Sequence, residues 1–161
     1  MRQRVPFSDV DMHGHVHNGV YCSYAETAVN ELLREAGLAA RFDPRSDAHG
    51  VVYHVKKIEL CYEGPAGFDD VLDITAHVRR IGTSSLAFDA VMVHAGDRAP
   101  VARVEVVWVC VDKEAGRARP IPAPTREALA ALRPAPDDAP DDAPEQAPAE
   151  APEPQRRPES R

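Results

Sequence analysis

One long stretch of helical periodicity, followed by four consecutive segments that alternate with a period of two, constrains the fold of this chain most strongly. Between residues 20 and 36, apolar residues recur at three- or four-residue spacing over a wide arc. Asn18 is a natural N-cap and Gly37 a natural stop. We therefore predict a helix over about residues 19–36 that is largely enclosed by other structure.

Four strands are predicted after this helix, at 53–62, 72–78, 86–92 and 101–111, with a phase slip near Lys56 and Lys57 in the first. The last is almost continuously apolar, as in a central strand covered on both faces. Gly-rich turns between the strands imply antiparallel pairing. A short strand is expected within residues 2–8 and a short helix at 125–132. The class is α+β, with one helix packed on a curved sheet of about five strands.

The last part of the chain differs in composition. Residues 134–161 include eight Pro and eight acidic residues but no Leu, Ile, Val or aromatic residue. Such a segment cannot bury enough apolar surface to offset its ordering entropy, so we predict a disordered acidic tail. A solubilising extension is the favoured interpretation, with a basic binding partner as the alternative.

Residues 1–133 form the predicted domain, and the charge of that part, about −2 of the chain's −7, does not favour nucleic acid. No apolar run is long enough to span a membrane, and no signal region opens the chain. Cys22, Cys61 and Cys110 are widely spaced, which favours reduced thiols in a cytoplasm over disulfides or a zinc site.

The segment just before the predicted helix concentrates chemically active side chains. Residues 9–18 hold two carboxylates, a glycine, three imidazoles and an asparagine. A helix N-terminus has unpaired N–H groups and a partial positive charge, which suit an anion or a developing oxyanion. A carboxylate a few residues upstream could act on a carbonyl polarised at that end.

This segment resembles the signature of hotdog-fold acyl-CoA thioesterases of the 4-hydroxybenzoyl-CoA thioesterase type, Phe-x-Asp-x-Asp-x-x-Gly-His-Val-Asn-Asn-x-x-Tyr. The matching positions are Phe7, Asp9, Asp11, Gly14, His15, Val16, Asn18, Tyr21, Tyr24 and Glu26. The resemblance extends over residues 4–132. It departs from the family at His17, where Asn is usual, and at Val29, where Arg is common.

The resemblance implies a hotdog fold, a long central helix wrapped by a curved sheet, and hydrolysis of a thioester without metal or organic cofactor. It assigns Asp11 as the catalytic carboxylate, acting as nucleophile or as general base. The Asn18 amide is the implied oxyanion donor, and Gly14 and His15 shape the loop. Taken alone, Asp11 could instead merely cap a turn.

Further site candidates surround this core. Glu26 is the backup carboxylate, with a structural polar contact as its alternative. His17 and Tyr21 are expected beside the substrate, whereas Tyr24, Tyr62 and Trp108 are expected in the core. The resemblance places Thr83, Ser84 and Ser85 near the CoA moiety, and Arg79 and Arg80 either meet its phosphates or are solvated. A zinc site formed by His13, His15 and His17 with Asp9 and Asp11 is disfavoured, because so tight a loop would not aim all rings at one ion.

The predicted function is hydrolysis of an acyl-CoA to a free acid and CoA. Release of an acyl or polyketide chain from an acyl carrier protein is the first alternative, and non-catalytic acyl-CoA binding is the second. The resemblance also implies a homodimer with active sites at its interface, or a homotetramer, which it favours. An open antiparallel sheet has an edge suited to such pairing.

Overall fold

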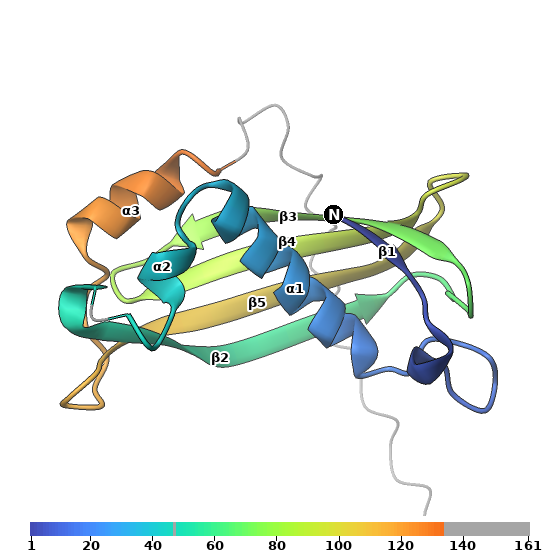
Figure 1. The fold of residues 1–161 in the computed structure, drawn as a ribbon, viewed down its shortest axis with the longest axis horizontal. Helices are drawn as coiled ribbons and strands as arrows, with labels where there is room; N and C mark the ends of the chain where they lie inside the picture. The colour runs from blue at the N-terminus through green and yellow to red at the C-terminus, as the bar shows by residue number, and fades with distance from the viewer. Residues whose placement is uncertain (47, 134–161) are drawn as a thin grey trace, which may run out of the picture.

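A computed structural model describes residues 1–46 and 48–133 of the chain (Figure 1). The elements, in chain order, are β1 (Arg2–Arg4), η1 (Phe7–Asp9), α1 (Val20–Glu35), α2 (Ala39–Phe42), η2 (Ala48–Gly50), β2 (Val51–Tyr62), β3 (Val71–Ile81), β4 (Ser85–His94), β5 (Pro100–Asp112) and α3 (Ala123–Ala130). The predicted α+β class, with one long helix and five strands, is confirmed. The predicted tail lies outside the described residues.

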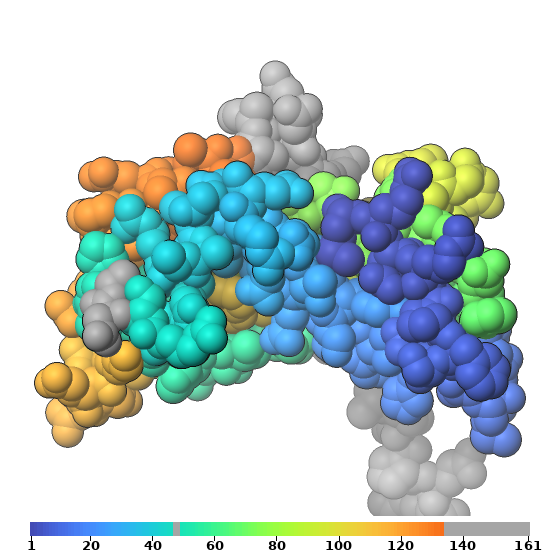
Figure 2. All heavy atoms as spheres, viewed as in Figure 1, coloured from blue at the N-terminus to red at the C-terminus, as the bar shows by residue number. Residues whose placement is uncertain are grey.

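The five strands form one antiparallel sheet in the order β1-β3-β4-β5-β2. Helix α1 lies across one face of this sheet, over β3, β4 and β5 (Figure 1). Its buried side chains, such as Ala25, Val29 and Leu33, belong to one hydrophobic core with Phe88 and Val106 of the sheet. In the space-filling view, β2 follows a concave edge of the molecule between the segments around residues 10–20 and 40–50 (Figure 2).

The long helix ends where the sequence predicts. Gly37 has a φ of +71°, and the amides of Gly37 and Leu38 bond to the carbonyls of Arg34 and Leu33 at 3.0 and 2.7 Å. This pair of bonds is a Schellman motif, in which a residue with positive φ closes the last turn. Glycine at position 37 therefore makes α1 stop before the next element begins.

The predicted N-cap is wrong. Gly19, with φ −72° and ψ −19°, is the N-cap of α1, and no side-chain cap bonds to the helix. The first turn forms because the His17 carbonyl accepts the Val20 amide at 2.9 Å. Asn18 lies one residue before this N-cap, and its carbonyl accepts the hydroxyl of Tyr62.

Two strand predictions have different outcomes. The phase slip near Lys56 is confirmed as a register shift between Val55 and Lys57, where β2 pairs with β5. The expectation that the last strand, β5, is covered on both faces is wrong for the described chain. Val107 and Val109 alternate with the buried Val106 and Trp108, so they point away from α1, and they are only half-buried.

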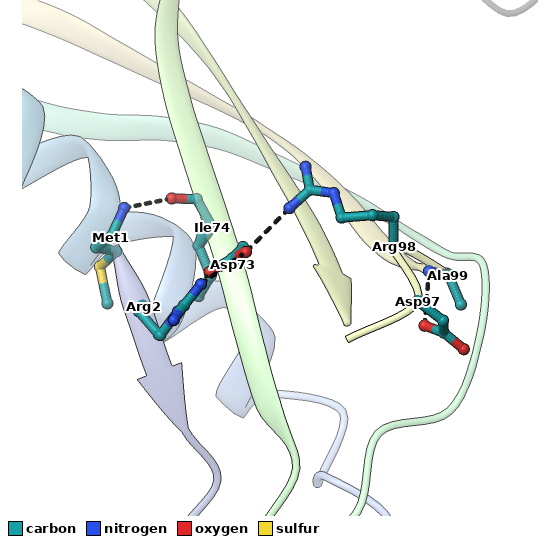
Figure 3. Close-up of polar contacts among 7 residues, drawn as sticks. All are labelled: Met1, Arg2, Asp73, Ile74, Asp97, Arg98 and Ala99. Atoms are coloured by element: carbon teal, nitrogen blue, oxygen red, sulfur yellow. Dashed lines mark hydrogen bonds and ion pairs between the residues drawn. The ribbon is translucent and has the colours of Figure 1, made fainter. Parts of the chain in front are cut away.

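The short first strand is held by polar contacts at its outer side (Figure 3). Arg2 and Arg98 both form ion pairs with Asp73, at 2.9 Å each, and the terminal amine of Met1 donates to the Ile74 carbonyl at 2.6 Å. Strand β1 covers only part of the predicted 2–8 segment, and η1 takes up the rest. These contacts fix the chain just before the segment that carries the candidate site.

The predicted C-terminal helix is present, beginning two residues earlier than expected, after Pro122. The short elements α2 and η2 between α1 and β2 were not predicted. Within the described part of the chain, no helix combines the length and apolar character needed to cross a membrane.

Candidate active site

The segment between η1 and α1 closes on itself as a tight loop. Val10 and Val16 form an antiparallel bridge. The Asp11 amide donates to the His15 carbonyl, and the His17 amide donates to the Asp9 carbonyl, at 2.8 Å each. The sharp reversal requires a residue with positive φ, which Gly14 supplies at +78°. Backbone pairing therefore brings Asp11 close to the start of α1.

The carboxylate of Asp11 is held by one of its two oxygens. Its Oδ1 accepts the amides of His13 and His15, at 2.8 and 3.3 Å. The His13 amide is the main cause that lowers the pKa of Asp11 below its ordinary value, partial burial opposes it, and the His15 amide adds to the lowering. Asp11 is thus ionised at neutral pH, and its Oδ2 accepts nothing from the residues the structure describes.

The neighbouring carboxylate has a different task. Asp9 Oδ2 accepts the hydroxyl of Tyr24 at 2.6 Å, and Oδ1 accepts the Ser8 hydroxyl at 2.9 Å. Tyr24 lies on α1 and is buried, and burial together with this bond raises its pKa well above the ordinary value. Tyr24 is therefore a neutral donor that ties the loop to the helix.

A second loop, between β2 and β3, supports the first from the other side. The Val16 amide donates to the Ala66 carbonyl at 2.7 Å, and His15 forms a bridge with Gly67. A Cβ at Gly67 would lie 3.1 Å from the Gly14 carbonyl oxygen, so the two backbones approach as closely as glycine allows. Asp70 Oδ2 accepts the Gly67 amide at 2.7 Å and holds this loop in turn.

At the start of α1, side chains hold both polar groups of the Asn18–Gly19 peptide. Tyr62, the last residue of β2, donates its hydroxyl to the Asn18 carbonyl at 3.2 Å. His17 Nδ1 accepts the Gly19 amide at 3.3 Å. The Asn18 amide finds no acceptor within residues 1–46 and 48–133. In a trans peptide the N–H opposes the C=O, and the His17 carbonyl points to Val20, so the Asn18 amide points away from the helix.

The remaining candidates near the loop differ in exposure. Tyr21 is 3% exposed and packs edge-on against Tyr62, with ring centroids 5.5 Å apart, so its place beside a substrate stays a prediction. Burial is the main cause that raises the pKa of Tyr21. Glu26 is half-buried, and no partner for its carboxylate occurs in the described part of the chain. Its role as backup carboxylate also stays a prediction.

The imidazoles of the loop do not converge. His13, His15 and His17 are all exposed, and His15 contributes through its backbone. Over the described residues, no group of three or more His, Cys, Asp or Glu side chains is arranged to hold a metal ion.

The predicted CoA-binding residues lie far from this loop in the same chain. Thr83 and Ser84 lie in the turn between β3 and β4 and Ser85 begins β4, whereas the Asp11 loop contacts the segment just before β3 begins. Eleven residues of strand separate the two sites, which corresponds to about 35 Å at 3.3 Å per residue. Arg126 of α3 fixes this turn by donating to the carbonyls of Gly82 and Thr83. One chain does not bring the two sets together.

The two anchoring tyrosines were not assigned to the site from sequence. Tyr24 is buried, as expected, yet its hydroxyl also serves the loop. Tyr62 was expected in the core and is 53% exposed, although its ring packs against Tyr21 of α1. Trp108, also expected in the core, is buried at 8% exposure. The position of Tyr24 on the predicted helix, one turn after Tyr21, could have indicated that it lies near the loop. No pattern in the sequence indicated that Tyr62 would contact Asn18.

Comparisons with known proteins show what this chain is similar to. A family model described as the thioesterase-like superfamily matches residues 5–129. The acyl-CoA thioester hydrolase YbgC of Escherichia coli O157:H7 is 30% identical over 119 residues, covering 74% of this chain and 86% of that protein. The long-chain acyl-CoA thioesterase FadM of Escherichia coli K12 is 25% identical over 123 residues, covering 76% of this chain and 90% of that protein.

Solved structures share the fold. The crystal structure of PA5185 from Pseudomonas aeruginosa superposes with a TM-score of 0.69 at 30% identity, covering 82% of this chain and 89% of that one.

Proposed function

Because the chain belongs to the thioesterase-like superfamily, we propose that it hydrolyses acyl-CoA thioesters to a free carboxylic acid and CoA. The relatives YbgC and FadM are named as acyl-CoA thioester hydrolases, and they align over three quarters of the chain. A thioester carbonyl is electrophilic and its thiolate is a good leaving group. The reaction therefore needs little more than a correctly placed carboxylate and a site for the oxyanion.

The observation that carries this proposal is the state of Asp11. The carboxylate is ionised, Oδ1 is oriented by two amides, and Oδ2 is unoccupied by the described residues. An oriented carboxylate with a free oxygen suits either direct attack on the carbonyl carbon or removal of a proton from water. We propose that the Asn18 amide receives the developing oxyanion, assisted by the positive end of α1.

The assay measures thiol release from acyl-CoAs of graded length and aromaticity. The Asp11→Asn variant keeps an oxygen that can accept the His13 and His15 amides but removes the charge and the nucleophile. We expect kcat to fall by about a hundredfold or more, the scale of a catalytic acid–base group. Asp97→Asn is the matched control, because Asp97 lies in the β4–β5 turn and also accepts a backbone amide, from Ala99.

Turnover by Asp11→Asn at the wild-type rate would reject the assignment of Asp11. Parallel reactions with the same acyl groups on CoA and on an acyl carrier protein separate the proposed substrate from the carrier-protein alternative. A kcat/KM greater for the carrier-bound acyl group would favour that alternative. Binding of acyl-CoA without any thiol release would favour a non-catalytic role.

We also propose that a second copy of the chain pairs along β2. This strand has 12 residues and, within the described sheet, pairs only with β5. Val55, Ile58 and Tyr62 are exposed at 49%, 37% and 53% on the α1 side of that edge. An unpaired strand edge can pair with the same edge of a second copy about a two-fold axis. A dimer is then the minimum assembly, and a tetramer needs a second contact.

The cytoplasm remains the proposed location. Cys22, Cys61 and Cys110 are all free thiols, and such cysteines persist in a reducing compartment. Fractionation of cells that produce the protein would test this.

A further inference from the structure

We propose that His17 and Tyr62 act together as a clamp on the Asn18–Gly19 peptide and are positioning residues for the Asn18 amide. This inference rests on the proposed function, because it concerns the oxyanion donor of that reaction. It differs from the sequence prediction for His17, which placed this residue in contact with substrate.

The clamp acts on one peptide from two sides. Tyr62 Oη donates to the carbonyl of that peptide at 3.2 Å, and His17 Nδ1 accepts from its N–H at 3.3 Å. Carbonyl and N–H lie on opposite sides of a planar trans peptide, so two partners on opposite sides fix the orientation of the whole plane. The two side chains come from different elements, the loop before α1 and the end of β2.

The preceding peptide is fixed as well. Its carbonyl, that of His17, accepts the Val20 amide at 2.9 Å, and its N–H belongs to Asn18. With the peptide planes on both sides of Asn18 held, the two dihedral angles of that residue are determined. The Asn18 amide is then kept in one direction, free of any described acceptor, before a substrate arrives. Donors fixed in advance stabilise an oxyanion without reorganisation during the reaction.

The identity of residue 17 is consistent with this role. An Asn at this position would accept the amide two residues on through its side-chain oxygen, as Asn does in local turns. A histidine does the same only through Nδ1 and only while that nitrogen has no proton. His17 therefore accepts the Gly19 amide as an Asn at position 17 would, whereas a Leu at this position would offer no acceptor.

Four variants and two controls test the clamp. Tyr62→Phe and His17→Leu each remove one contact, and His17→Asn restores an acceptor. The double variant Tyr62→Phe/His17→Leu removes both contacts. Tyr53→Phe is the control for the tyrosine, because Tyr53 also lies on β2 and its hydroxyl has no partner among the described residues. His77→Leu is the control for the histidine, because His77 lies on β3, outside both the Asp11 loop and the proposed β2 contact.

We expect Tyr62→Phe and His17→Leu each to lower kcat about tenfold with KM within about twofold, because an oxyanion contact is made in the transition state rather than with bound substrate. His17→Asn retains most of the wild-type kcat. The double variant loses less than the product of the single losses, since both contacts hold one peptide. Both controls turn over like the wild type.

A second readout does not depend on activity. Hydrogen exchange at the Gly19 amide, followed by NMR, is expected to accelerate in His17→Leu and to stay near the wild-type rate in His17→Asn. Wild-type kcat in Tyr62→Phe and His17→Leu, a rise in KM in place of the fall in kcat, or unchanged Gly19 exchange in His17→Leu would overturn the clamp. Failure of the proposed function is distinguishable from failure of the clamp. It would appear as thiol release by Asp11→Asn at the wild-type rate, irrespective of the exchange rate of the Gly19 amide.

Discussion

The bond between Tyr24 and Asp9 offers a direct test of how the loop is held to α1. Tyr24→Phe removes one hydroxyl and leaves the ring, so the packing of a side chain that is 7% exposed is retained. The lost bond is short, 2.6 Å, and has a charged acceptor. Such bonds contribute about 1.5–3 kcal/mol to the free energy of unfolding. Because Asp9 is only half-buried and water can replace the hydroxyl, we expect the lower end, about 1.5 kcal/mol.

The measurement is equilibrium unfolding in urea. With a slope of about 1–3 kcal/mol per molar urea, a loss of 1.5 kcal/mol lowers the midpoint by about 0.5–1.5 M at unchanged slope. Tyr53→Phe is again the control, and its midpoint is expected to stay within error or to rise, because removing an unpaired buried hydroxyl removes no bond.

A double-mutant cycle separates this bond from other effects of the hydroxyl. In an Asp9→Ala background, Tyr24→Phe is expected to cost less than about 0.5 kcal/mol, because the acceptor is already gone. Equal costs in the two backgrounds, or an unchanged midpoint in the single variant, would refute the role assigned to this bond. Severalfold loss of kcat in Tyr24→Phe is expected to accompany the loss of stability, because the same loop carries Asp11.

Three further predictions follow from the same structure. Gly64→Ala is expected to lower the free energy of unfolding by about 1–3 kcal/mol, because a Cβ at Gly64 would lie 2.5 Å from the Pro100 carbonyl oxygen. Gly96→Ala is the control in the same assay: a Cβ at Gly96 has open space around it, so the free energy of unfolding is expected to change by no more than about 0.5 kcal/mol. The acid limb of kcat/KM is expected below the ordinary Asp pKa of about 3.9, because the His13 and His15 amides lower the pKa of Asp11. The stabilisation of the fold by those amides is present above the unfolded-state pKa of Asp11 and is lost as pH falls through its folded-state pKa. An acid limb above pH 5 in a pH–rate profile would contradict this assignment. Ile58→Lys is expected to shift the protein to a smaller species in analytical ultracentrifugation, and an unchanged mass would exclude pairing along β2.

Much of the fold follows from local pattern. The helix boundaries depend on a period of 3.6 and on Gly37, whose positive φ few other residues adopt. The four strands follow from a period of two, and the bulge beside Lys56 was visible as a break in that period. Patterns that repeat along the chain report burial on one face, so one sequence is enough to place these elements.

The site was predictable only where its contacts are local. The turn at Asp11 closes within four residues, and the Asp11 side chain accepting nearby amides is what the turn-capping interpretation expects. The support from Ala66 and Tyr62 comes from 50 and 44 residues away, through the way β2 ends against α1. Periodicity places a residue on a face but does not give its neighbour across a loop. The N-cap prediction failed for a local reason, because the carbonyl and Nδ1 of His17, rather than the Asn18 side chain, accept the Val20 and Gly19 amides.

Pairing along β2 determines whether the Asp11 loop and the predicted CoA-binding residues Thr83, Ser84 and Ser85 can act on one substrate. Within one chain, Ser84 lies a full strand length, about 35 Å, from the Asp11 loop. Antiparallel pairing of two β2 strands reverses the second copy, so that its β3–β4 turn comes to the same end of the joined sheet as the first copy's Asp11. That turn is then about three to four strand spacings away, or 15–20 Å. The CoA prediction for Thr83, Ser84 and Ser85 therefore needs the dimer, and Ile58→Lys should lower kcat/KM for acyl-CoA together with the mass of the assembly.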